Sequence, residues 1–320
     1  MISVKQRKLI VVSILILSIT ACSNNSIFEV TEPTKALEGL VEPTEAGNVV
    51  EVIGSETSTS PTSQPLLEEV EVVLLNIPER IQAASFEYSG LAWFGEDLVL
   101  LPQFPQGKDF SREANLFTIA KGDLLQAIEN PDLELLIRDV PIINSDLRKV
   151  IKGFEGFESI LFVEGEVYLT IESRAGNPMM GYLIRGEVKG ELESITLDPE
   201  SVVELVPFSS AGNATFEAMT YWNGKLYILY EHNSKQGDKL PVAYQYNLDL
   251  ELEQEIPFPV VDYRITDATV SDSTGKFWVM NYFFPGDTHL AIDQDALILE
   301  YGEGETHANN EPVERLVELQ

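Results

Sequence analysis

Apolar runs alternate with short polar turns along most of the chain, and this arrangement predicts pairs of adjacent β-strands. The segments SGLAWFGEDLVLLPQ, ESILFVEGEVYLTIE and EAMTYWNGKLYILYE share it: an apolar strand, a polar turn, and a second apolar strand. A pair of polar residues, fourteen positions apart, recurs with the pattern. The pairs are Ser89 and Gln103, Glu158 and Glu172, Glu217 and Glu231, and Asp267 and Asn281. Their return along the chain indicates a repeat fold.

Four units of four strands each can be laid out around these pairs. The predicted strands are 90–94, 97–103, 115–120 and 133–139, with a helix at 123–129; then 159–163, 166–172, 181–188 and 192–197; then 218–222, 225–231, 242–247 and 252–257; and finally 268–272, 276–282, 296–301 and 313–319. Units of this length with variable loops are typical of β-propeller blades. A β-sandwich is the competing fold, but it gives no reason for the polar pair to recur. We therefore predict an all-β propeller with four recognisable four-stranded blades.

Two features of the sequence leave the fourth polar pair and the closure of the ring undecided. The turn at 272–275 is one residue longer than its counterparts, so the second polar residue of the fourth pair could be Asn281 or Tyr282. A further strand is predicted at 69–77, ahead of the first unit. The ring would then either close as four blades with an extra N-terminal strand, or stop short of a fifth blade, leaving open strand edges.

The first 21 residues read as a signal peptide. Lys5, Arg7 and Lys8 precede an apolar run over 9–20, which is too short to span a bilayer. The run ends in ITAC, which resembles the bacterial lipobox, and Cys22 is the only cysteine in the chain. A lone cysteine cannot form an internal disulfide, so we expect Cys22 to carry a lipid; the alternative is an ordinary secretory signal with an incidental cysteine. Several acyl chains would anchor the protein stably to a membrane.

The rest of the chain divides into a tether and a folded domain. Residues 22–65 are rich in Thr, Ser, Pro and Glu, a composition that cannot bury enough apolar surface to fold. Residues 66–320 form the predicted propeller domain. We expect the protein to face the periplasm or the exterior of a bacterial cell, held to the membrane through the lipid on Cys22.

The charge of the chain limits its partners. The formal net charge is −31, with 52 acidic and 21 basic residues. Nucleic-acid binding is excluded on this ground, because affinity for a phosphate backbone depends on Lys and Arg. The negative charge also disfavours binding to anionic lipid surfaces and favours binding of cations. An acidic surface can equally serve only to keep a protein soluble. The partners left open are a protein, a glycan or a small molecule.

The units FEGFESILFVEGEVYLTIESR and FEAMTYWNGKLYILYEHN resemble blades of the phytase-like (esterase-like) β-propeller domain, and more loosely those of the gluconolactonase/regucalcin family. In such propellers, carboxylates and amides of the inner strands converge on a central channel and often hold a divalent cation, typically Ca²⁺. The resemblance implies that the channel or metal ligands are Glu158, Glu172, Glu217, Glu231, Asp267 and Asn281. The first pair, Ser89 and Gln103, has neutral side chains at these positions. Phytases also need many basic residues near the phosphates, and this chain supplies only scattered ones, which argues against phytate hydrolysis.

Carboxylates gathered around one axis raise one another's pKa, so protons or a hard cation must compensate them. Ca²⁺, with its six to eight oxygen ligands, suits such a site. Alternatively, each glutamate caps backbone N–H groups or faces water in the channel. Zinc lacks its His and Cys ligands, and no GxSxG elbow, Walker loop or dinucleotide fingerprint occurs. His232, beside Glu231, could shuttle protons, although a single loop histidine usually lies at the surface.

Two functions follow from these patterns. The first is a non-catalytic module, displayed outside the membrane, that binds a protein, glycan or small molecule. The second is a Ca²⁺-dependent hydrolase of an ester, lactone or phosphoester, with Glu231 or Glu172 as ligand or base.

Overall fold

The computed structural model describes residues 72–82, 85–108, 112–176, 178–209, 213–234, 239–284, 286–287, 290, 295–302, 304, 308–309 and 313–320. The signal peptide, Cys22 and the tether therefore lie outside the described residues. Within the described ranges, no helix is long and apolar enough to cross a bilayer.

The first two blades are joined at their outer edges. Blade 1 contains β1 (Tyr88–Phe94), β2 (Asp97–Pro102), β3 (Asn115–Ala120) and β4 (Arg138–Ile143), with helix α1 (Lys121–Glu129) between β3 and β4. Blade 2 contains β5 (Phe154–Val163), β6 (Glu166–Ser173), β7 (Met180–Lys189) and β8 (Ser194–Leu197), and the short β9 (Val203–Leu205) also pairs with β7. Strands within a blade run antiparallel, whereas β4 and β8 pair in parallel. This parallel pairing makes one nine-stranded sheet of the two blades.

The other two blades are separate sheets. Blade 3 contains β10 (Ala218–Trp222), β11 (Lys225–Leu229), β12 (Val242–Tyr246) and β13 (Leu252–Pro257). Blade 4 contains β14 (Arg264–Ala268), β15 (Phe277–Phe283) and β16 (Val313–Leu319), and helix α2 (Ala296–Tyr301) lies between β15 and β16 in the chain. Short 3₁₀ turns occur at Glu79–Ile81 and Pro199–Ser201.

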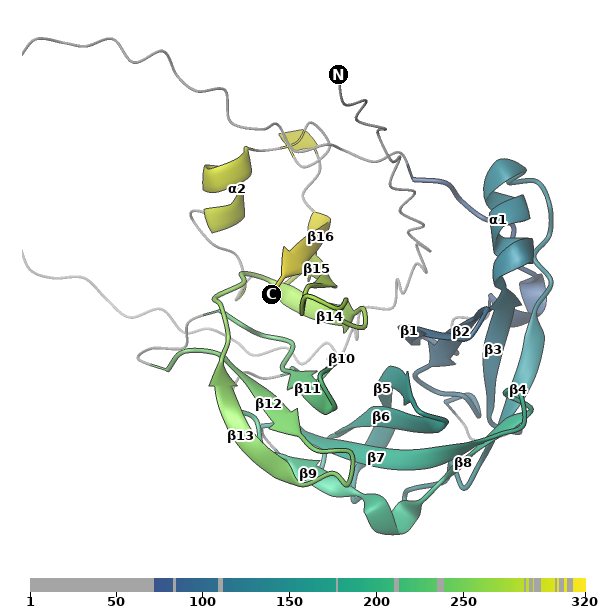
Figure 1. Cartoon of the computed structure of the whole chain (residues 1–320), viewed down its shortest axis with the longest axis horizontal. Helices are drawn as coiled ribbons and strands as arrows, with labels where there is room; N and C mark the ends of the chain where they lie inside the picture. The colour runs from purple at the N-terminus through teal and green to yellow at the C-terminus, as the bar shows by residue number, and fades with distance from the viewer. Residues whose placement is uncertain are drawn as a thin grey trace, which may run out of the picture.

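The innermost strands form a closed ring. Strand β1 contacts β5, β5 contacts β10, β10 contacts β14, and β14 returns to β1 (Figure 1). The first strands of neighbouring blades run in the same direction, because Gly90 lies against Ser159 near one end and the rings of Phe94 and Phe162 meet 5.2 Å apart at the other. The fold is a β-propeller. Among the described residues, the contact between β14 and β1 brings four blades into a nearly closed ring.

Packing between blades explains the long apolar runs. Val99 and Leu101 of blade 1 share a buried cluster with Ile171 and Ile184 of blade 2. Similar clusters join blade 2 to blade 3 and blade 3 to blade 4. A strand between two blades is buried on both faces, so its sequence is apolar at successive positions instead of alternating. The stability of the ring therefore resides mainly between the sheets.

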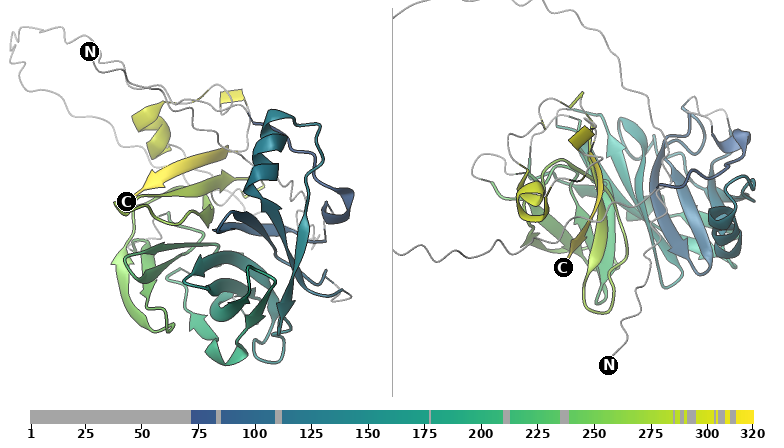
Figure 2. Two further views of the ribbon diagram at one scale, coloured as in Figure 1. Left: turned by 45° about the vertical axis from the view of Figure 1, so that its right-hand side comes forward. Right: turned by 90° about the horizontal axis from the view of Figure 1, so that it is seen from above.

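Blade 1 is different on its other face. There Leu98, Leu100 and Phe117 pack against Leu124 of α1 and against Ile81 and Phe86 of the segment before β1. Figure 1 shows blades 1 and 4 diverging outward from β1 and β14, and Figure 2 shows α1 beside blade 1. The ring is thus closed by its innermost strands, while a helix and a loop cover the outward part of this face.

The structure corrects several predicted strands near the ends of the domain. Residues 72–77 form no strand, only an isolated bridge between Asn76 and Glu134, and 69–71 lie outside the described residues. The predicted strand at 133–139 is displaced as well, because β4 begins only at Arg138. The predicted strand at 268–272 is also displaced, because β14 ends at Ala268.

The predicted strand at 296–301 is instead helix α2. The carboxylate of Asp295 accepts hydrogen bonds from the backbone N–H groups of Leu297 and Ile298, which is an N-cap. The place beside β15 is taken by β16, so blade 4 has three strands among the described residues.

Candidate functional site

The polar pairs of blades 1 to 3 occupy equivalent positions. The strand pairings Gly90–Leu101, Ser159–Thr170 and Ala218–Leu229 correspond to one another, and a polar residue precedes the first member of each. In blades 1 and 2 this residue sits at a β-bulge, which re-aims its side chain relative to the ladder. The first polar residues are Ser89, Glu158 and Glu217. The second polar residue of each pair lies two positions after the second member of the strand pairing; these are Gln103, Glu172 and Glu231.

Blade 4 departs from this register. Its bulge falls between Ile265 and Asp267, and Asp267 pairs with Met280. By the same counting, Thr266 and Tyr282 occupy the two positions of the polar pair. The two positions are therefore sixteen residues apart instead of fourteen, and Tyr282, not Asn281, corresponds to Glu231.

Asp267 and Asn281 are engaged with the backbone. The Oδ2 atom of Asp267 accepts a hydrogen bond from the N–H of Leu91 at 3.1 Å, and Oδ1 accepts one from Ala268 at 2.8 Å. The fully buried Asn281 donates from Nδ2 to the carbonyls of Asp262 and Arg264, both at 2.9 Å. Asp267 thereby joins blade 4 to blade 1, whereas Asn281 fixes the chain entering β14.

Blade 1 meets blade 2 at a pair of glutamates. The amide nitrogen of Gln103 donates to Oε1 of Glu158 at 2.6 Å and to Oε1 of Glu172 at 2.7 Å. The two carboxyl groups also contact each other, and this contact contributes to the raised pKa of Glu158. Glu158 is buried and Glu172 half-buried. One neutral amide thus donates to both carboxyl groups of the pair.

Blade 3 meets blade 4 at a second pair. Glu217 is hydrogen-bonded to Glu231, and the guanidinium of Arg264 forms an ion pair with Glu231. Arg264 also donates from Nε to Oδ2 of Asp287 at 2.8 Å. The N–H of Thr215 reaches Oε2 of Glu231 at 3.3 Å. A buried cation therefore compensates this pair directly.

The two pairs act on one another electrostatically. Burial raises the pKa of Glu158 well above its usual value, and the charges of Glu172 and Glu217 raise it further. Burial and the charge of Glu231 likewise raise the pKa of Glu217 well above its usual value. Burial also raises the pKa of Glu231, but the Arg264 guanidinium opposes that effect. In each pair, burial and the charge of the neighbouring carboxylate therefore favour the protonated form of Glu158 and of Glu217.

Two other carboxyl groups titrate near neutrality. Burial, with the charge of Glu155, raises the pKa of Glu172 to about 7. Burial raises the pKa of Asp267 to about 7 against the effect of its two backbone hydrogen bonds. Perturbed values of this kind mark functional sites in many proteins, but structural networks produce them as well.

The residues as placed do not fit a calcium site. Among the described residues, no group of three or more His, Cys, Asp or Glu side chains is arranged to hold a metal ion. The four glutamates contact one another in two pairs, Asp267 accepts hydrogen bonds from the backbone, and Oδ1 of Asn281 accepts one from Arg315. Arg264 compensates the charge of Glu231, and the raised pKa values of Glu158 and Glu217 favour their neutral forms. Calcium binding stays an untested prediction.

Sequence reasoning missed Arg264 and misplaced His232. Arg264 lies at the start of β14, where the sequence DYRITDA offers one signal: a basic residue at the first position of the strand. His232, expected at the surface, is buried and forms an isolated bridge with Arg264. That bridge places His232 beside Arg264 of blade 4.

Comparisons with known proteins establish no family for the chain. No family model matches it, and no curated protein matches it. Among solved structures, it is similar to the β-propeller domain of Nup133 from Vanderwaltozyma polyspora, with 12% identity over 62% of this chain and 54% of that one, and a TM-score of 0.33. It is also similar to a mutant of the GH32 β-fructofuranosidase BmSUC1 of Bombyx mori in complex with sucrose, with 15% identity over 61% of this chain and 42% of that one, and a TM-score of 0.35. The chain covers less than two thirds of either structure.

Proposed function

We propose that this protein is a lipid-anchored, extracytoplasmic β-propeller that binds a ligand and performs no catalysis. One observation carries the proposal: the candidate site residues are bonded within the protein. Gln103 engages the Glu158–Glu172 pair, Arg264 engages Glu231, and Asp267 engages the backbone of blade 1. These contacts use the groups that a metal or a substrate would need.

The same contacts have a structural role. Gln103 bonds blade 1 to blade 2, Arg264 bonds blade 4 to blade 3, and Asp267 bonds blade 4 to blade 1. Backbone hydrogen bonds repeat two of these links, because Phe157 N–H donates to the Gln103 carbonyl and Ile265 N–H to the Glu231 carbonyl. A polar ring of this kind fixes how the blades meet, and it leaves the outer surface for recognition.

Membrane anchoring is part of the proposal and rests on the sequence. The basic start, the short apolar run and the terminal ITAC support a lipid on Cys22. The acidic tether would then hold the propeller away from an anionic membrane surface.

A second function is favoured by one observation, the pKa of Glu172. A half-buried carboxyl group with a pKa of about 7 is suited to act as a general base near neutral pH. The alternative is therefore a hydrolase of an ester, lactone or phosphoester with Glu172 as base. Glu231 suits that role less, because Arg264 is paired with it. Ca²⁺ would bind only if the paired glutamates released their protons.

Turnover assays separate the two functions. The full chain would be offered ester, lactone and phosphoester substrates, each with calcium and with a chelator, from pH 6 to 9. We expect no turnover that exceeds the uncatalysed rate. Turnover that is lost in Glu172→Gln and kept in Glu204→Gln, an exposed glutamate of β9, would contradict the binding-module proposal and establish the hydrolase.

A further inference from the structure

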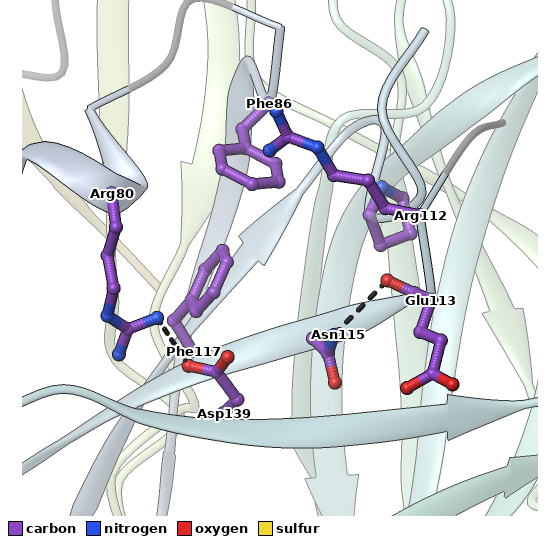
Figure 3. A pocket seen from close by; sticks show the side chains of 8 residues that line it. Arg80, Phe86, Arg112, Glu113, Asn115, Phe117 and Asp139 are labelled. Atoms are coloured by element: carbon purple, nitrogen blue, oxygen red, sulfur yellow. Dashed lines mark hydrogen bonds and ion pairs between the residues drawn. The ribbon is translucent and has the colours of Figure 1, made fainter. Parts of the chain in front are cut away.

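Blade 1 carries a pocket on the face that packs against α1 and the segment before β1. The cavity measures about 320 Å³, and its lining includes Arg80, Phe86, Arg112, Phe117 and Asp139 (Figure 3). This volume lies at the lower end of the range of small-molecule sites. The pocket is on the outer part of blade 1 and shares no residue with the glutamate pairs.

Arg112 has no carboxylate partner among the described residues. Its guanidinium lies over the ring of Phe86, 5.4 Å from the centroid, and the carboxylate of the adjacent Glu113 points away from it (Figure 3). The other arginines in the described ranges all form ion pairs: Arg80, Arg138, Arg148, Arg174, Arg185, Arg264 and Arg315. In a chain with 52 acidic and 21 basic residues, an arginine left without a carboxylate, facing a pocket, indicates a ligand that supplies one.

Both arginines of the pocket contact aromatic rings. Arg80 lies over the ring of Phe117 at 5.8 Å and donates to Oδ1 of Asp139 at 2.6 Å. The rings of Phe86 and Phe117 meet edge to face, 5.1 Å apart. Both rings are buried, so the surfaces against which the two guanidinium groups stack are rigid. Arg112 itself is exposed, so a ligand could reach its guanidinium from solvent.

The charges select the class of anion. A planar guanidinium binds a carboxylate through two parallel hydrogen bonds. Asp139 and Glu113 also line the pocket, and the net charge of −31 repels anions in general. Both effects penalise a doubly charged phosphate more than a single carboxylate.

We propose that this pocket binds a small monocarboxylate, with the carboxylate on Arg112 and the body of the ligand beside Phe86 and Phe117. The proposal rests on the binding-module function and names the class of ligand. Its readout is binding at blade 1, whereas the hydrolase assay measures turnover at the centre of the ring, so failure of one is distinguishable from failure of the other.

Isothermal titration of the full chain with benzoate, benzamide and inorganic phosphate tests the proposal. We expect benzoate to bind at millimolar concentration or below, and benzamide and phosphate to bind at least about tenfold more weakly, as expected for loss of a charge-assisted pair. Arg112→Gln should weaken benzoate binding by about tenfold or more with no change in melting temperature. The matched control is Arg148→Gln, an exposed arginine outside the pocket.

Three results would overturn the proposal. They are no benzoate binding to the parent at millimolar concentration, benzoate binding that Arg112→Gln leaves unchanged, and phosphate binding as tight as that of benzoate. An equal loss in Arg148→Gln would also overturn it, because the effect would then come from net charge.

Discussion

Glu172→Gln should make the protein more resistant to rising pH. Glu172 has a pKa of about 7 in the folded chain, against an ordinary value of 4.5. Because the folded value is the higher one, the folded chain binds more protons than the unfolded chain between these two values. The free energy of unfolding attached to this group is therefore fully present below about pH 4.5 and is lost as the pH rises through about 7.

The size of the effect follows from the same values. At about 1.36 kcal/mol for each pKa unit, raising the pKa from 4.5 to about 7 corresponds to about 3 kcal/mol. For a domain of this size, 1 kcal/mol shifts the melting temperature by roughly 2–4 °C, so the expected difference is roughly 6–12 °C. Glutamine keeps an oxygen that can accept the hydrogen bond from Gln103, but it does not titrate.

Scanning calorimetry of the parent and of Glu172→Gln, from pH 5 to pH 8, measures this directly. The melting temperature of the variant, relative to that of the parent, should rise across this range. The control variant Glu204→Gln, at an exposed position of β9, should follow the parent. Parallel curves for the parent and Glu172→Gln would refute the paired-glutamate account, as would a strong loss of stability in the variant at pH 5.

Three further predictions concern the rest of the network and the anchor. Arg264→Gln should destabilise the fold by about 3–5 kcal/mol at pH 8, because it leaves Glu231 charged, buried and unpaired. The loss should be smaller at pH 5, where Glu231 can take up a proton. Denaturant unfolding at both pH values measures the loss, and a loss that does not depend on pH would contradict this account. Calcium should leave the melting temperature unchanged, whereas a rise of about 2.7 kcal/mol in stability at a hundredfold excess over its dissociation constant, abolished by Glu217→Gln with Glu231→Gln, would favour the calcium-dependent alternative. Cys22→Ser should release the protein from the membrane fraction, and a serine variant as firmly bound as the parent would rule out the lipid anchor.

Local pattern was sufficient for most of the strands. Strand β10 (Ala218–Trp222) and strand β13 (Leu252–Pro257) have the predicted bounds, and the other strands of blades 2 and 3 differ from prediction mainly at their ends. A hairpin is specified by apolar residues on either side of a glycine-containing turn, all within about fifteen residues of sequence. The equivalence of the polar residues in blades 1 to 3 is visible for the same reason: the hairpins have equal length.

The sequence was insufficient wherever a distant segment competes for the same residues. Residues 296–301 are apolar enough for a strand, but the N-cap at Asp295 and the pairing of β15 with β16 make them a helix. The register of blade 4 also depends on a bulge after Ile265, which the spacing of Asp267 and Asn281 does not reveal.

The sequence by itself determined that a ring of blades would bring carboxyl groups together and that something must compensate their charge. The tertiary structure decided what does so. Gln103 lies 55 residues before Glu158, and Arg264 lies 33 residues after Glu231, and both partners come from a neighbouring blade. Residues of separate blades come together only when the blades pack against one another, so no local pattern could indicate these partners. Burial, which raises the pKa of each glutamate, is likewise a property of the closed ring and not of the strand that carries the residue.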